Sequence, residues 1–117
     1  MTDSIDAHQH FWQLARGDYD WLTTDLAPIY RDFEPADLAP YLQRHGIAGT
    51  VLVQAAPTDA ETEFLLDIAA RTDFVRAVVG WCDFAAADAP DRIAALAARP
   101  KLAGLRPMIQ DLPDDDW

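Results

Sequence analysis

The sequence has few of the features that mark secreted or membrane-spanning proteins. Cysteine occurs once, as Cys82, so no disulfide can form within the chain and a reducing compartment fits best. The first residues do not combine a basic stretch with a long apolar one, and no run approaches ~18 consecutive apolar residues. We therefore expect neither a secretory signal nor a membrane-spanning helix, and we predict a soluble cytoplasmic protein.

Positive charge is also scarce. Nine Lys and Arg residues stand against 20 Asp and Glu residues, which gives a formal net charge of -11. Because phosphate groups would be repelled, we expect neither nucleic acid nor an anionic membrane as a partner. Half of the residues are apolar, so a chain of 117 residues can bury the core of one domain of ordinary size.

Short apolar runs alternate with helical patterns along the chain. The runs typical of strands are residues 4–8, 49–56, 74–81 and 101–107. The helical patterns are residues 34–45, residues 58–71, and a third that begins at Pro90 and is stopped by Arg99 and Pro100. A long polar and aromatic loop, at about residues 9–34, follows the first run.

Two of the helix starts carry local signals. Pro35 suits a first helical turn, and Gly46 suits a left-handed ending, whereas Pro40 is unfavourable inside a helix and favours a later start. Thr58, with Glu61 three residues later, is typical of a capping box, in which each side chain binds the other residue's backbone N–H.

Strands and helices in strict alternation predict parallel βα units in an α/β fold. Two architectures fit this order: a small open doubly wound sheet, or part of a (β/α)8 barrel, which needs roughly 250 residues when complete. Because the chain stops soon after its fourth strand, we expect the first four βα units of a barrel, a half-barrel. Its two unpaired edges and open face should promote association, including homo-oligomers.

Polar side chains gather where the predicted strands end. Asp6, His8 and His10 alternate along the first strand and should point to one side of it. Active sites lie at the carboxyl ends of strands in barrels and open α/β sheets alike. Two imidazoles there suit a divalent metal such as zinc or manganese, and Asp6 either orients one of them or binds backbone N–H groups. The alternative is that both are loop histidines with structural hydrogen bonds.

Four further residues at strand ends are candidates for substrate binding. Arg106 can grip a carboxylate or sugar-acid oxygen, or can form a salt bridge to an acidic residue, and Pro107 restricts its backbone. Gln54 can bind a ligand or stabilise its loop, and Trp81 can stack on a sugar or pack in the core. Asp83 can line the site or cap a turn. We expect Cys82 to be an inert core residue.

Four segments together carry a resemblance to a known family. They are "IDAHQHFW", "GTVLVQAAPT", "VVGWCDF" and "LAGLRPMIQDLPDDDW", in this order and covering essentially the whole chain. These motifs resemble the amidohydrolase superfamily, and within it the amidohydrolase-2 branch with sugar-lactone hydrolases of the L-fuconolactonase and L-rhamnonolactonase type.

The resemblance implies a distorted (β/α)8 barrel that opens sugar-acid lactones with activated water. It implies that His8 and His10 are a metal-site pair, in a branch where metal dependence varies, and that Arg106 contacts the substrate carbonyl or carboxylate. Members of the family are more than twice this length, and the strand-eight aspartate that acts as general base is absent here. We therefore predict that residues 1–117 are the N-terminal part of one barrel domain, with little or no activity alone. The alternatives are a partner-dependent inactive fragment and a small open-sheet binding protein without catalysis.

Overall fold

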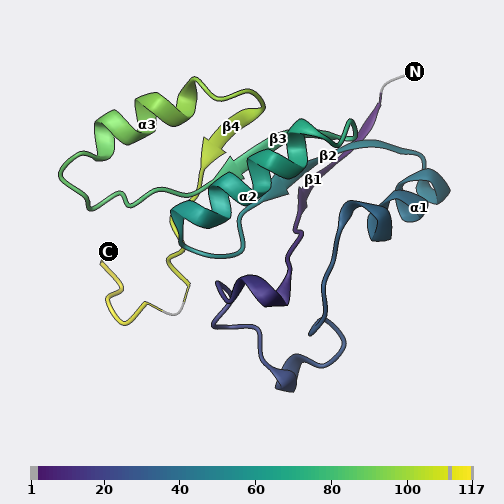
Figure 1. Ribbon diagram of the computed structural model, residues 1–117, viewed down its shortest axis with the longest axis horizontal. Helices are drawn as coiled ribbons and strands as arrows, with labels where there is room; N and C mark the ends of the chain where they lie inside the picture. The colour runs from purple at the N-terminus through teal and green to yellow at the C-terminus, as the bar shows by residue number, and fades with distance from the viewer. Residues whose placement is uncertain (1–2, 111, 117) are drawn as a thin grey trace.

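The computed structural model describes residues 3–110 and 112–116, and it shows one parallel sheet with helices between its strands (Figure 1). The strand order is β1-β2-β3-β4, so each later strand pairs with the one before it in sequence. The elements are β1 Ser4–Gln9, α1 Pro35–His45, β2 Ile47–Val53, α2 Asp59–Ala70, β3 Val75–Gly80, α3 Ala89–Ala97 and β4 Leu102–Leu105. The predicted α/β class with parallel βα units is confirmed. None of the helices in the described part of the chain has the length and apolar character to cross a membrane.

The helix α1 tolerates the proline that was expected to delay its start. It begins at Pro35, and Pro40 lies inside it on the exposed side. The N–H that Pro40 lacks would have bonded the carbonyl of Ala36, and Ala36 is itself exposed, so water can satisfy that carbonyl. The carboxylate of Asp37 accepts the backbone N–H of Glu34 at 2.8 Å, and Gly46 ends the helix with a φ of 66°. The helix therefore begins one residue after the predicted residue 34 and ends at the predicted residue 45, and the later start that Pro40 favoured is not observed.

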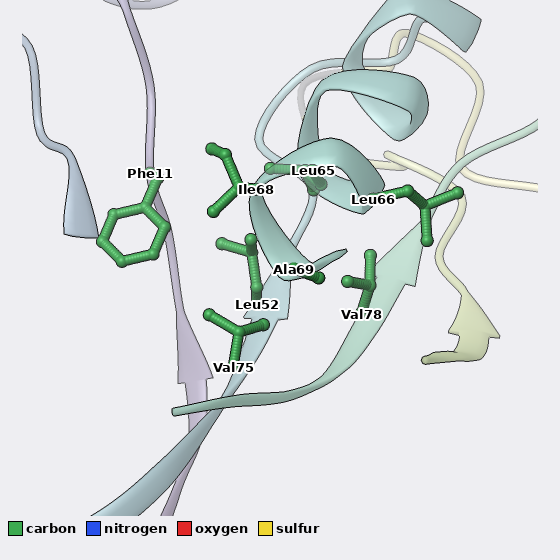
Figure 2. Packing of buried hydrophobic residues seen from close by; sticks show 8 residues of the cluster. All are labelled: Phe11, Leu52, Leu65, Leu66, Ile68, Ala69, Val75 and Val78. Carbon is green, nitrogen blue, oxygen red and sulfur yellow. The ribbon is translucent and has the colours of Figure 1, made fainter. Parts of the chain in front are cut away.

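The main apolar core lies between α2 and the sheet (Figure 2). Leu52 comes from β2, and Val75 and Val78 come from β3, while Phe11 follows β1. The helix contributes four buried residues at helical spacing: Leu65, Leu66, Ile68 and Ala69. This burial fixes α2 on one face of the sheet and leaves the carboxyl ends of the strands free for other groups.

The contact between α2 and β3 is close enough to require a glycine. A Cβ at Gly80 would lie 2.8 Å from Cγ2 of Thr62, which is tighter than carbon atoms tolerate. The Thr62 hydroxyl accepts the backbone N–H of Trp81 at 2.8 Å and donates to the Trp81 carbonyl at 2.7 Å. Thr62 therefore binds the helix to the backbone at the end of β3.

The chain between β1 and α1, residues 10–34, is called the connecting segment below. It contains two short 3₁₀ helices, Leu14–Arg16 and Thr24–Leu26, and it extends from the carboxyl end of β1 away from the sheet (Figure 1). Trp12 and Phe33 form an antiparallel bridge with backbone hydrogen bonds of 3.1 and 3.0 Å. Trp12, Tyr19 and Leu22 of the segment pack with Ala55 and Ala56, which follow β2, in a second apolar cluster.

Candidate active site

His8 and His10 lie side by side at the carboxyl end of β1. Their ring centroids are 4.9 Å apart, with the ring planes at 79°. His8 is exposed, whereas His10 is half-buried and stacks on Trp12, with 6.2 Å between centroids. The predicted placement of both imidazoles on one side of the strand end agrees with this geometry.

A backbone carbonyl fixes the orientation of His10. Its Nδ1 lies 2.8 Å from the carbonyl oxygen of Val53, the last residue of β2. Because a carbonyl oxygen can only accept, Nδ1 carries the proton, and in the neutral ring Nε2 keeps its lone pair for another partner. Burial lowers the pKa of His10, and its electrostatic interactions with His8 and Arg106 lower it further. The hydrogen bond to Val53 opposes this shift without reversing it.

Asp6 takes the second of its two predicted roles. Its Oδ1 accepts the backbone N–H of His8 at 3.1 Å. Asp6 is half-buried, and this hydrogen bond is to the backbone of its own strand and not to an imidazole.

Arg106 follows β4 and is held by Gln54, which follows β2. The Arg106 Nε donates to the Gln54 side-chain oxygen at 2.7 Å, and Nη2 donates to the Gln54 backbone carbonyl. The ion pairs within residues 3–110 and 112–116 do not include Arg106, so a salt bridge is not its role in this part of the chain. Burial lowers the pKa of the Arg106 guanidinium, which nevertheless stays charged.

Two candidate residues that follow different strands, His10 and Arg106, are therefore bonded to two consecutive residues at the end of β2. Val53 holds His10 from β1, and Gln54 holds Arg106 from β4. The charge of Arg106 also contributes to the lowered pKa of His10. The carboxyl edge of the sheet thus brings together a histidine pair and an arginine, which suits binding of a polarised carbonyl or a carboxylate.

The remaining candidates lie apart from this group. Trp81 is half-buried and contributes to a cavity of about 290 Å³ between α2 and α3, whose other lining residues include Thr62, Arg92 and Leu96. Asp83 is exposed and caps a turn, because its Oδ1 accepts the backbone N–H of Ala85 at 3.0 Å. Their predicted substrate contacts stay predictions.

Cys82 is fully buried, and burial raises the pKa of its thiol, as expected of an inert core cysteine.

A buried carboxylate at the start of α2 was missed by sequence reasoning. Glu61 is 0% exposed and accepts three hydrogen bonds: from Arg16 at 2.8 Å, from the Tyr19 hydroxyl at 2.7 Å, and from the Ala55 backbone N–H at 2.7 Å. Thr58 does accept the Glu61 N–H at 3.0 Å, but the Glu61 side chain bonds these groups in place of the predicted return bond to Thr58. Glu61 lies four residues before Leu65 and so on the same face of the helix, and this spacing could have predicted its burial.

The two histidines fit part of a metal site. Neutral imidazole nitrogen is a ligand for zinc and related ions, and His10 is held so that Nε2 is the free donor. Among the described residues, no group of three or more His, Cys, Asp and Glu side chains is arranged to hold a metal ion. His8 and His10 would therefore need further donors to complete a coordination shell.

The chain matches a known protein family and several of its members. The profile of the amidohydrolase family matches residues 5–117, a range that includes Asp111 and Trp117, which lie outside the described residues. A protein named L-fucono-1,5-lactonase from Burkholderia ambifaria is 58% identical over 117 residues, which are 100% of this chain and 40% of that protein. A second L-fucono-1,5-lactonase, from Burkholderia multivorans, is 36% identical over 110 residues, or 94% of this chain and 37% of that protein. The chain thus spans about two fifths of the length of these relatives.

Solved structures agree with the sequence comparison. A crystal structure of an amidohydrolase from Burkholderia multivorans with bound zinc matches 97% of this chain and 39% of its own, with a TM-score of 0.87 and 35% identity. Amidohydrolase 2 from Bifidobacterium longum subsp. infantis has a TM-score of 0.57 at 24% identity, over 68% of this chain and 32% of its own, and supports the fold alone. The chain belongs to the amidohydrolase family, and its parallel sheet with helices matches the N-terminal part of an amidohydrolase (β/α)8 barrel. The predicted family resemblance and barrel fold are confirmed.

Proposed function

We propose that the protein carrying this sequence hydrolyses the lactone of a sugar acid, with L-fucono-1,5-lactone as the first substrate to test. The proposal is supported by the 58% identity to a protein of that name over the whole of this chain. It is supported equally by the pairing of His10 with Val53 and of Arg106 with Gln54 at one edge of the sheet. We also propose that residues 1–117 are the N-terminal part of a single barrel domain.

The proposed reaction is attack of water on the lactone carbonyl. A bond forms between the water oxygen and the carbonyl carbon, negative charge develops on the carbonyl oxygen, and the ring C–O bond then breaks. The product is an open hydroxy acid, which releases one proton at neutral pH. Arg106 donates to the carbonyl oxygen and stabilises the charge that develops there, because its own charge is not neutralised by a carboxylate in the described residues.

His8 and His10 are the residues that would hold a divalent cation such as zinc, with donors from outside this chain. A bound zinc ion would supply Lewis-acid polarisation and lower the pKa of coordinated water. The hydrogen bond from His10 Nδ1 to Val53 keeps the ring in one tautomer and one orientation. We assign no general base within residues 1–117, and we propose that this chain alone has little or no activity.

The test is hydrolysis of a panel of aldonolactones by the full-length protein, followed by proton release with and without chelator. We expect L-fucono-1,5-lactone to be among the hydrolysed substrates, and His8→Ala to lower kcat/KM or the affinity for zinc. The matched control is His45→Ala, because His45 is exposed at the end of α1 and should leave the rate unchanged. Background rates for every lactone would refute the proposed function, and loss of activity in both variants would refute the role of His8.

A further inference from the structure

The polar atoms of Gln54 are buried and bonded within the protein. Its side chain is 0% exposed. The side-chain oxygen accepts from Arg106 Nε at 2.7 Å, and the side-chain nitrogen donates to the Ala56 carbonyl at 3.1 Å. Its backbone N–H donates to the Val79 carbonyl at 2.8 Å, and its own carbonyl accepts from Arg106 Nη2. Each of its polar atoms therefore has at least one partner inside the protein, and burial keeps the second amide N–H away from solvent.

The same contacts leave part of Arg106 free for a ligand. A guanidinium has five N–H donors in a rigid plane, so two bonds from Nε and Nη2 to one residue fix the orientation of the whole group. Within the described residues, the hydrogen bonds of the Arg106 side chain use Nε and Nη2. Nη1 remains for another acceptor.

The partner that holds the Arg106 guanidinium is neutral, and this affects the charge of the site. An amide oxygen and a backbone carbonyl orient the guanidinium without cancelling its charge, whereas a carboxylate in the same place would form an ion pair. A positive charge that is held but not neutralised stabilises developing negative charge without reorganisation during the reaction. The preceding residue, Val53, holds His10 through its carbonyl, so one short stretch of backbone sets the positions of both groups.

We propose that Gln54 is a positioning residue: it holds the Arg106 guanidinium, uncompensated and with Nη1 available, for the carbonyl oxygen of the lactone. This inference rests on the proposed function for the identity of the ligand. It assigns to Gln54 a role that acts through Arg106, in place of the direct substrate contact predicted from its position at a strand end.

The test is a double-mutant cycle in the full-length protein with Gln54→Met, Arg106→Met and the double variant. We expect Gln54→Met to lower kcat/KM by about 10- to 100-fold, mostly through kcat, because a misplaced catalytic donor loses transition-state stabilisation. In the Arg106→Met background, the same change should cost less than about 3-fold, because the group that Gln54 holds is gone. Gln43→Met, at an exposed position of α1, is the control. Losses that multiply in the double variant would overturn the inference.

A second variant separates orientation from charge. Gln54→Glu keeps an oxygen for Arg106 Nε and neutralises the guanidinium, although it also replaces the N–H that donates to the Ala56 carbonyl with an oxygen. We expect KM to change little and kcat to fall by about 10-fold or more. A kcat equal to that of the unmodified protein would contradict the requirement for an uncompensated charge.

A third measurement needs neither activity nor a substitution. Hydrogen exchange of the arginine Nε–H groups, followed by nitrogen-15 NMR of the unmodified protein, should be slow at Arg106 and fast at the exposed Arg44. If no lactone is hydrolysed, the proposed function fails while slow exchange at Arg106 still supports the positioning contact. Exchange at Arg106 as fast as at Arg44 would refute that contact, whatever the activity.

Discussion

The helix-covered face of the sheet and the connecting segment each contain a buried cluster, but different chemistry holds the two clusters. Between α2 and the sheet, the core consists of aliphatic side chains and Phe11. Around the connecting segment, aromatic rings pack on each other, and a buried carboxylate, Glu61, supplies the polar contacts. Trp12 belongs to the second region, with Trp21 and Phe33 packed edge-on at 5.3 and 5.5 Å.

This difference explains how an irregular segment can keep a defined position beside the candidate site. Apolar burial is non-directional, so it stabilises regular layers without specifying the path of a loop. Glu61 instead bonds two residues of the segment, Arg16 and Tyr19, and the backbone at Ala55, just beyond β2. Because His10 opens the segment and is bound to Val53, the polar network and the candidate site share one short stretch of backbone.

The largest expected effect comes from removing the buried carboxylate. Glu61→Ala leaves the Arg16 guanidinium, the Tyr19 hydroxyl and the Ala55 N–H without their partner, and we expect a loss of about 4 kcal/mol in the free energy of unfolding. Urea denaturation measures this loss. Glu63→Ala is the matched control, because Glu63 is exposed on the same helix and its ion pair with Arg99 lies on the surface. Equal losses in the two variants would mean that the network does not stabilise the segment.

The apolar layer should respond differently to a cavity. Leu65→Ala removes a fully buried side chain from the core, and we expect a loss of about 3 kcal/mol in the free energy of unfolding. Hydrogen exchange should show protection reduced across α2 and the strands, with the bridge between Trp12 and Phe33 retained at low denaturant. Leu26→Ala, at an exposed position of the connecting segment, should change stability little. If the bridge lost its protection at a lower denaturant concentration than the sheet, the two regions would not be held independently.

The smallest expected effect is a dependence of stability on alkaline pH that comes from the connecting segment. Burial, together with the hydrogen bond to Glu61, raises the pKa of the Tyr19 hydroxyl above its ordinary value. The unfolded chain loses this proton above about pH 10 while the folded chain keeps it, so stability should fall as pH rises past that point.

Urea denaturation at pH 8 and at pH 10.5 measures the fall. It should be smaller in Tyr19→Phe than in the unmodified protein, because the ionising group is gone. Tyr41→Phe, at an exposed position of α1, should leave the dependence unchanged. An identical alkaline fall in Tyr19→Phe would show that ionisation of Tyr19 contributes nothing.

The sheet was predictable because its signals are local. Apolar runs predicted all four strands, although β2 ends at Val53 and not at residue 56, because the backbone at Ala55 bonds Glu61 in place of a neighbouring strand. The expectation that Pro40 would delay the start of α1 was wrong, because water can satisfy the unpaired carbonyl on the exposed side of a helix. Strand phase correctly put His8 and His10 together.

The contacts that organise the site were not predictable because they join residues far apart in sequence. Gln54 and Arg106 are 52 residues apart, and Arg16 and Glu61 are 45 apart. No local pattern distinguishes a glutamine that binds substrate from one that holds an arginine. The position of Glu61 fits a capping box, but it fits equally a buried carboxylate that binds Arg16. Which of these two roles the side chain takes depends on the path of the connecting segment.

The rate of lactone hydrolysis in two arginine variants of the full-length protein tests the central claim most directly. Arg106→Met removes the arginine at the carboxyl edge, and Arg71→Met removes an exposed arginine that pairs with Asp67 on α2. We predict that Arg106→Met lowers kcat/KM for L-fucono-1,5-lactone by about 100-fold or more, as expected for loss of a donor to the developing oxyanion, and that Arg71→Met changes it by less than about 2-fold. An Arg106→Met protein that is folded and as active as Arg71→Met would contradict the assignment of this edge of the sheet as the active site.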